Sequence, residues 1–173
     1  RPDRAETGYG WLELHSKLSD NFAAVAQPLS SFVEKPEAEA ADVLLRGGMH
    51  LWNSGIFLFS TSNILTSFEQ HAPQTLAEVR NAFDAAEADL GFTRLAAEPW
   101  DRLEDISIDY AVMEHAPNLS VMPYGGYWSD LGDWQAIFRE GEEDSFGVVA
   151  TGSSTALDCK DTLLVATSET QEL

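Results

Sequence analysis

The chain has 173 residues and carries 29 Asp and Glu against 10 Lys and Arg, a formal net charge of −19. A nucleic-acid-binding protein needs a basic surface to displace counterions from phosphates, so this composition excludes nucleic acid as a partner. An anionic membrane surface would repel the chain too, and no apolar run in the sequence is long enough to span a bilayer. The hydrophobic share of 44% predicts a folded domain with a core.

The single cysteine, Cys159, excludes an intrachain disulfide and a metal site built from cysteines. This cysteine usage fits a reducing compartment, and we expect a cytoplasmic protein. Residues 1–6 contain no apolar segment like that of a signal peptide, and the first residue is Arg1. We therefore expect the chain to begin inside a longer protein.

Strands are predicted at residues 10–14, 29–34, 56–59 and 119–124. Pro36 ends the second of them, because proline cannot donate to a strand ladder. The run 56–59 is apolar without interruption, which is typical of a strand covered on both faces. These strands alternate with predicted helices, which favours an α/β domain.

The predicted helices have clear start signals. They are residues 37–46, a segment capped by Ser60, a segment that begins at Pro73, residues 108–115 after Ser107, and a segment capped by Asp133. A stripe of three aromatic residues, Phe83, Trp134 and Phe138, is predicted to be core.

The composition changes after the acidic stretch 140–144, which is typical of a linker. Residues 148–150 and 163–166 follow as two short predicted strands. We therefore divide the chain into an α/β part, residues 1–140, and a linker with a short β tail, residues 141–173.

Several catalytic motifs are missing. The sequence has no Gly-Lys-Ser/Thr phosphate loop and no Gly-x-Ser-x-Gly nucleophile elbow. The pair Gly8 and Gly10 begins a dinucleotide fingerprint, but Glu13 stands where the third glycine belongs. The four histidines are scattered without the spacing of metal ligands.

The segment Glu34-Lys35-Pro36 is more informative. Lys35 is one of three lysines and ends a predicted strand, and ligands of α/β sheets collect at the carboxyl ends of strands. Lysine can hold a phosphate, and glutamate can accept hydrogen bonds from sugar hydroxyls. An ion pair at a strand end would explain the same two residues without a ligand, and the motif alone favours that interpretation.

Three further polar positions allow two interpretations each. Asn53 precedes a predicted strand and can bind a polyol or form an ordinary turn. Asp130 lies among aromatic residues and can hold Mg²⁺ or serve as a turn residue. Asp109 begins a predicted helix, where interaction with the helix dipole is a simpler role than lining a pocket.

Five segments in this order resemble the bacterial mannose-1-phosphate guanylyltransferase family, also called GDP-mannose pyrophosphorylase. They are Glu6–Gly10, Phe32–Pro36, Trp52–Phe57, Ser107–Glu114 and Trp128–Trp134. The resemblance runs from Glu6 to Phe138 and continues weakly into the tail. Five motifs in the right order are far more specific than any one of them.

The resemblance implies a nucleotide-diphospho-sugar transferase fold, with a mixed, mostly parallel sheet flanked by helices. It implies that GTP and mannose 1-phosphate form GDP-mannose and pyrophosphate with Mg²⁺. Because half of a sheet exposes an apolar edge and face, we also expect the chain to cover that surface by self-association, as a homo-oligomer. The resemblance also implies a role for five residues. Gly10 would approach the sugar phosphate, Glu34 would bind sugar hydroxyls, Lys35 the phosphate and Asn53 the mannose, and Asp130 would ligate the metal. Lys35 and Asp130 would be the catalytic residues.

The family also has a glycine-rich nucleotide loop, a guanine-reading region and a second metal-binding aspartate, which this sequence does not contain. We therefore expect residues 1–140 to be the sugar-phosphate half of the enzyme and the 173-residue chain to be inactive alone. Two alternatives stay open. The chain could be a sugar-phosphate-binding or interaction module without catalysis, or a related nucleotidyltransferase with another base or sugar.

Overall fold

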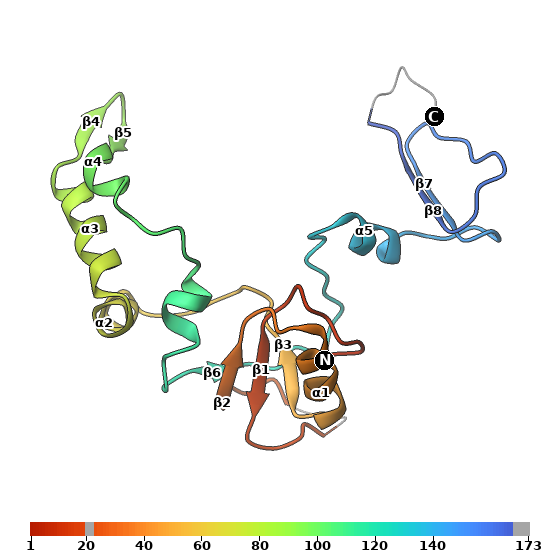
Figure 1. Cartoon of the computed structure of the whole chain (residues 1–173), viewed down its shortest axis with the longest axis horizontal. Coiled ribbons are helices and arrows are strands. Elements are labelled where there is room, and N and C mark those ends of the chain that lie inside the picture. The colour runs from red at the N-terminus through yellow and green to blue at the C-terminus, as the bar shows by residue number, and fades with distance from the viewer. Residues whose placement is uncertain (20–22, 168–173) are drawn as a thin grey trace. The chain divides into compact units, whose positions relative to one another are not determined.

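The computed structural model describes residues 1–19 and 23–167 (Figure 1). The chain forms two compact units, Arg1–Gly125 and Gly126–Leu173, which are described separately. The division that the resemblance suggests, after residue 140, stays a prediction. In the structure the last helix lies in the same unit as the β tail.

A four-stranded sheet with the order β3-β1-β2-β6 organises the first unit (Figure 1). Its strands are β1 (Trp11–Leu14), β2 (Gln27–Val33), β3 (His50–Trp52) and β6 (Ser120–Val121). All neighbouring strands pair antiparallel, with Trp11 opposite both Val33 and Trp52. The predicted strand 119–124 is shorter than expected, and Pro123 beyond it has no N–H to donate.

The expectation of mostly parallel pairing is wrong for the strands of this sheet. A parallel pair needs a long crossover, usually a helix, and the described residues between β1 and β2 contain no helix. Parallel pairing occurs in the second unit, between β7 (Val148–Thr151) and β8 (Thr162–Val165).

Helix α1 (Ala38–Gly47) confirms the predicted helix and its end. It follows Glu37 and ends at Gly48, whose φ of 65° is left-handed and suits glycine. Ala41 is its fully buried residue. The helix leads directly into β3, which is an outer strand of the sheet.

The prediction of a strand at residues 56–59 is wrong. The strand comes earlier, as β3, and Gly55 turns the chain with a φ of 69°. Ile56 and Leu58 are 79% and 100% exposed within this chain. The apolar run thus follows a turn and lacks a neighbouring strand in the described part of the molecule, so it is not the buried strand that its composition predicts.

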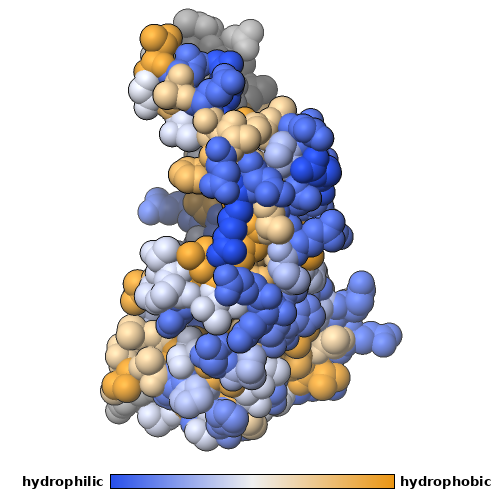
Figure 2. All heavy atoms as spheres, turned by 90° about the vertical axis from the view of Figure 1, so that its left-hand side faces the viewer, coloured by the Kyte–Doolittle hydropathy of each residue, from blue (hydrophilic) through white to orange (hydrophobic). Residues whose placement is uncertain are grey.

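Two helices and a hairpin follow. Helix α2 (Thr61–His71) is capped by Ser60, whose Oγ accepts the N–H of Asn63 over 3.2 Å. Helix α3 (Pro73–Asp84) begins at Pro73 as predicted. The hairpin β4 (Glu87–Asp89) and β5 (Phe92–Arg94) was not predicted, and α4 (Ala97–Trp100) comes next. Figure 2 shows the side of the molecule that lies at the left of Figure 1. Its surface is largely hydrophilic, with hydrophobic side chains between the polar ones.

A single π-helical turn, η1 (Asp109–Met113), lies where the helix 108–115 is predicted. Its central residues belong to the core of the first unit, and α2 packs against it. The buried members of this core are Leu12, Leu14, Phe32, Leu51, Ala111, Val112 and Met113. The core therefore ties η1 to β1, β2 and β3.

The second unit contains α5 (Trp134–Glu140) and the parallel pair β7 and β8. Asp133 caps α5, as predicted, by accepting the N–H of Ala136 over 2.6 Å. The aromatic stripe is not core in this chain, because Phe83 and Trp134 are 64% and 66% exposed. None of the described helices is long and apolar enough to cross a membrane.

Candidate functional site

Three of the predicted site residues meet at one edge of the sheet. Gly10 precedes β1, while Glu34 follows β2 and Asn53 follows β3. Because β1 is antiparallel to both neighbours, its beginning lies beside their ends. The N–H of Asn53 donates to the carbonyl oxygen of Gly10 over 2.7 Å, which fixes this arrangement.

Gly10 has no room for a side chain. A Cβ atom there would lie 2.5 Å from Oε2 of Glu34 and 3.1 Å from Cβ of Asn53. Its missing side chain is what allows the glutamate and the asparagine to approach from both sides. In this chain the close approach at Gly10 involves these two side chains, and its approach to a sugar phosphate stays a prediction.

Glu34 and Lys35 form a tight turn at the end of β2. Lys35 has a φ of 45°, an uncommon left-handed conformation for lysine, and its N–H donates to the carbonyl oxygen of Tyr9 over 3.2 Å. Nζ of Lys35 lies 3.1 Å from Oε1 of Glu34. The lysine side chain is half exposed, whereas the glutamate side chain is 7% exposed. A buried carboxylate thus anchors an ammonium group that solvent can reach.

The carboxylate of Glu34 is only partly satisfied. Its Oε2 is buried and has no hydrogen-bond partner among the described residues. Burial raises the pKa of Glu34, the hydrogen bond from Lys35 opposes this rise, and the negative charges of Asp109 and Glu114 add to it. The same hydrogen bond raises the pKa of Lys35, so the ammonium stays charged at neutral pH. The site therefore combines a cation with an acceptor that lacks a donor.

The structure adds two carboxylates that the sequence did not assign to the site. Nδ2 of Asn53 donates to Oδ1 of Asp109 over 3.1 Å, and the N–H of Glu34 donates to Oε1 of Glu114 over 2.8 Å. The sequence placed both acids on a regular helix, where positions five apart point in different directions. The π-helical turn brings them to the same edge, and no sequence signal for that turn was recognised.

Asp130 belongs to the second unit, where it lies on a turn. It is exposed, and its Oδ1 accepts the N–H of Gly132 over 3.2 Å. No group of three or more possible metal ligands occurs among residues 1–19 and 23–167. One carboxylate on an exposed turn still fits Mg²⁺, which keeps several waters and also binds substrate phosphates. The pairing of Asp130 with Lys35 across one site stays a prediction.

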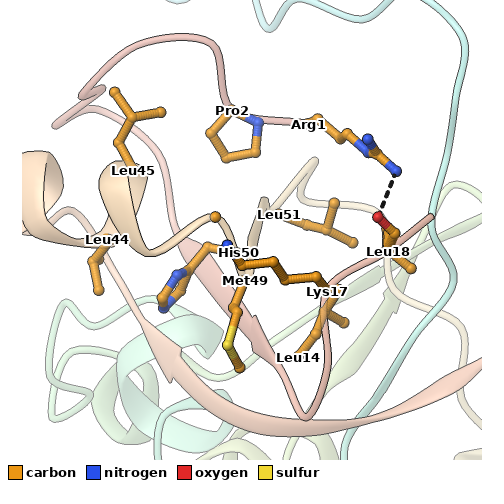
Figure 3. Close-up of a pocket in the computed structure, with 11 residues that line it drawn as sticks. Arg1, Pro2, Leu14, Lys17, Leu18, Leu44, Leu45, Met49, His50 and Leu51 are labelled. Carbon is orange, nitrogen blue, oxygen red and sulfur yellow. Dashed lines mark hydrogen bonds between the residues drawn. The ribbon is translucent and has the colours of Figure 1, made fainter. Parts of the chain in front are cut away.

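A cavity of about 320 Å³ lies at the opposite end of β1 and β3 (Figure 3). Leu14 and His50 line it, together with the N-terminal Arg1, which donates to the carbonyl oxygen of Leu18 over 3.2 Å. None of the predicted site residues lines this cavity. The candidate site is thus an open edge of the sheet, and we call the cluster of Gly10, Glu34, Lys35 and Asn53 the edge site.

Residues 1–147 match the sequence family described as nucleotidyl transferase, and the chain belongs to this family. The predicted fold class and family resemblance are confirmed. Over 166 residues the chain is 39% identical to a mannose-1-phosphate guanylyltransferase of Sinorhizobium fredii. That alignment covers 96% of this chain and 32% of the relative, so the chain spans about a third of this relative.

Two of the similar solved structures are described by their titles as proteins that act on mannose phosphates. A protein of Thermus thermophilus, described as mannose-1-phosphate geranyltransferase, has 31% identity and a TM-score of 0.70 over 91% of this chain and 44% of its own. A mannose-6-phosphate isomerase from Helicobacter pylori has 28% identity and a TM-score of 0.64 over 75% of this chain and 49% of its own. Together with the family match, these similarities place the chain in the nucleotide-sugar transferase fold. The chain spans less than half of either solved protein.

Proposed function

We propose that this chain carries the sugar-phosphate half of an enzyme that forms GDP-mannose and pyrophosphate from GTP and mannose 1-phosphate. The name of the Sinorhizobium relative supports this activity. The observation that carries the proposal is the edge site, where the half-exposed ammonium of Lys35 is anchored by the buried carboxylate of Glu34. Asn53 lies beside them across Gly10.

Each group of the edge site has a partner in a phosphorylated hexose. The ammonium of Lys35 has donors beyond its bond to Glu34 and would bind the phosphate. A sugar hydroxyl would supply the donor that Oε2 of Glu34 lacks, and a buried acceptor without a donor costs free energy. Asn53 would bind the mannose with the N–H and the acceptor capacity that its two internal hydrogen bonds leave over.

The proposed reaction is a direct displacement. A phosphate oxygen of mannose 1-phosphate attacks the α-phosphorus of GTP, and the bond from that phosphorus to the oxygen bridging to the β-phosphate breaks. The electron pair leaves with pyrophosphate. Lys35 would contribute by holding the attacking phosphate in place and reducing its charge, because positioning and electrostatics dominate such transfers. Mg²⁺, when bound, would neutralise phosphate charge, and Asp130 would be its protein ligand.

Three further features belong to this proposal. The enzyme would act in the cytoplasm, as a homo-oligomer, and residues 1–173 alone would not transfer a guanylyl group, because the sequence contains no glycine-rich nucleotide loop. A turnover assay with GTP and mannose 1-phosphate tests the last point, since formation of GDP-mannose by these residues would contradict it. Sugar-phosphate binding without turnover is common to this proposal and to the binding-module alternative. A longer protein that transfers guanylyl would exclude the module.

Calorimetric titration with mannose 1-phosphate tests the edge site. Lys35→Ala should weaken binding at least about tenfold, the effect of losing one charge-assisted hydrogen bond of about 1.5–3 kcal/mol. Lys17→Ala is the matched control, because Lys17 is an exposed lysine of the same unit that lines the cavity at the opposite end of β1. Equal binding by wild type and Lys35→Ala would contradict the proposed role of the edge site.

A further inference from the structure

We propose that Asp109 and Glu114 are positioning residues of the edge site, in which Asp109 orients the side-chain amide of Asn53 and Glu114 holds the backbone turn that carries Lys35. This inference rests on the proposed function, because it takes Asn53 to bind the sugar and Lys35 its phosphate. Neither acid is proposed to contact the substrate. Each acts through another residue, Asn53 or Lys35, that is proposed to contact it.

Asp109 determines which way the amide of Asn53 faces. An ionised carboxylate only accepts hydrogen bonds, so the atom that lies 3.1 Å from Oδ1 of Asp109 has to be the amide nitrogen. The amide oxygen in turn accepts the N–H of Gly55 over 3.0 Å. These two bonds select one of the two orientations that an asparagine amide can adopt. A ligand therefore meets one N–H and one acceptor position of Asn53 in fixed places.

Glu114 holds a strained segment. The left-handed conformation is sterically unfavourable for lysine, so the φ of 45° at Lys35 persists only if its surroundings hold it. Tyr9 accepts the N–H of Lys35, and Glu114 accepts the preceding N–H, that of Glu34, over 2.8 Å. Two successive peptide groups are thus tied down, one by Tyr9 just before β1 and one by Glu114 at the end of η1.

One π-helical turn supplies both acids. The N–H of Glu114 donates to the carbonyl oxygen of Asp109 over 3.0 Å, the bond that closes this wider turn. In an α-helix, residues five apart would point about 140° away from each other and could not both reach the edge of the sheet. Such π turns are frequent at functional sites. Ala111, Val112 and Met113 are buried in the core, which anchors the turn.

The test uses isosteric substitutions in the full chain and two ligands. Asp109→Asn should weaken mannose 1-phosphate about tenfold and leave inorganic phosphate unchanged, because it disturbs the contact to the sugar. Asp109→Asn should have no further effect in an Asn53→Ala background, as a double-mutant cycle measures directly. Glu114→Ala should weaken both ligands about tenfold, and Glu114→Gln, which keeps an acceptor oxygen, should restore most of the loss.

Hydrogen exchange of the Glu34 amide gives a readout without any ligand. Glu114→Ala should speed its exchange at least tenfold, and Glu114→Gln should return it toward wild type. Thermal unfolding of each variant shows whether it folds, and Asp109→Glu provides a second substitution at that position. Wild-type sugar-phosphate affinity in Asp109→Asn, or losses that add to those of Asn53→Ala, would overturn the role of Asp109. Unchanged Glu34 exchange in Glu114→Ala would overturn the role of Glu114.

These outcomes separate the two proposals. If the wild-type chain binds mannose 1-phosphate and Lys35→Ala binds it at least about tenfold more weakly, the proposed role of the edge site stands whatever the two acids do. If the wild type does not bind it, the proposed function fails, and with it the role of Asp109 toward the sugar. The exchange of the Glu34 amide then still decides whether Glu114 holds the turn.

Discussion

Oε2 of Glu34 lies so close to Gly10 that a Cβ atom at position 10 would be 2.5 Å from it. Real side chains do not approach to that distance, so any residue but glycine would force the carboxylate to move. This contact couples the beginning of β1 to the end of β2. A substitution at Gly10 therefore tests both the packing of this region and its ligand binding.

We expect Gly10→Ala to lower the free energy of unfolding by about 1–3 kcal/mol, the usual cost of overpacking a tight site. It should also weaken mannose 1-phosphate, because the displaced carboxylate is the anchor of Lys35. Urea unfolding and calorimetry measure the two effects. Gly47→Ala is the control, since a Cβ there meets nothing within 4 Å and alanine favours the last turn of α1. Equal losses in both variants would refute the packing argument.

The backbone at Lys35 supports a second prediction, which compares two variants that both lack the ammonium. Lys35→Gly should be more stable than Lys35→Ala by about 1 kcal/mol, because glycine adopts a φ of 45° without the steric cost that alanine shares with lysine. Both should lose affinity for the sugar phosphate. Urea midpoints at equal m-values measure the difference. Equal midpoints would mean that position 35 is unstrained.

The residues of the edge site could be predicted from the sequence, but the two acids that orient them, Asp109 and Glu114, could not. Glu34 and Lys35 stand where an apolar strand ends, and Asn53 stands two residues before Gly55 at a turn. These patterns alone left an interpretation without a ligand open, and the family resemblance assigned the residues to one site. The bonds that orient them come from η1, 56 and 80 residues away along the chain. Contacts over such separations depend on tertiary packing, which local patterns do not contain.

Two short segments were also predicted wrongly from the sequence, for different reasons. The apolar run 56–59 has the composition of a buried strand, yet pairing depends on a neighbour that the described residues do not offer. The π-helical turn was predicted as an ordinary helix, because its apolar pattern is the same over so few residues. Capped helices were predicted well, as at Ser60 and Asp133, because a cap is a local hydrogen bond.

The exposed apolar run supports a third prediction, on self-association. Ile56 and Leu58 are largely exposed in the isolated chain, and paired substitution of both by serine removes that apolar surface. If these side chains are covered by a second copy, wild type should associate at high concentration and the double variant should stay monomeric. Val43→Ser is the control, an exposed valine on α1. Light scattering that shows a monomeric wild type at high concentration would contradict the proposed homo-oligomer for this chain.

The buried carboxylate of Glu34 supports a fourth prediction, on pH. Burial is the main cause that raises the pKa of Glu34, so folding disfavours its charged form. Below the ordinary glutamate pKa the group is protonated in both states and costs nothing. As pH rises through the raised pKa, the native state pays for a buried charge that the unfolded chain solvates, and stability falls.

Glu34→Gln removes this charge with little change in shape. Its stability relative to wild type should therefore increase as pH rises from about 4 to 7. The lost ion pair offsets little, because Lys35 is half exposed. Mannose 1-phosphate affinity should fall in the same variant. Urea unfolding across this pH range measures the first effect, with Glu104→Gln as the exposed control. A stability difference that is constant with pH would show that the carboxylate is not destabilised by burial.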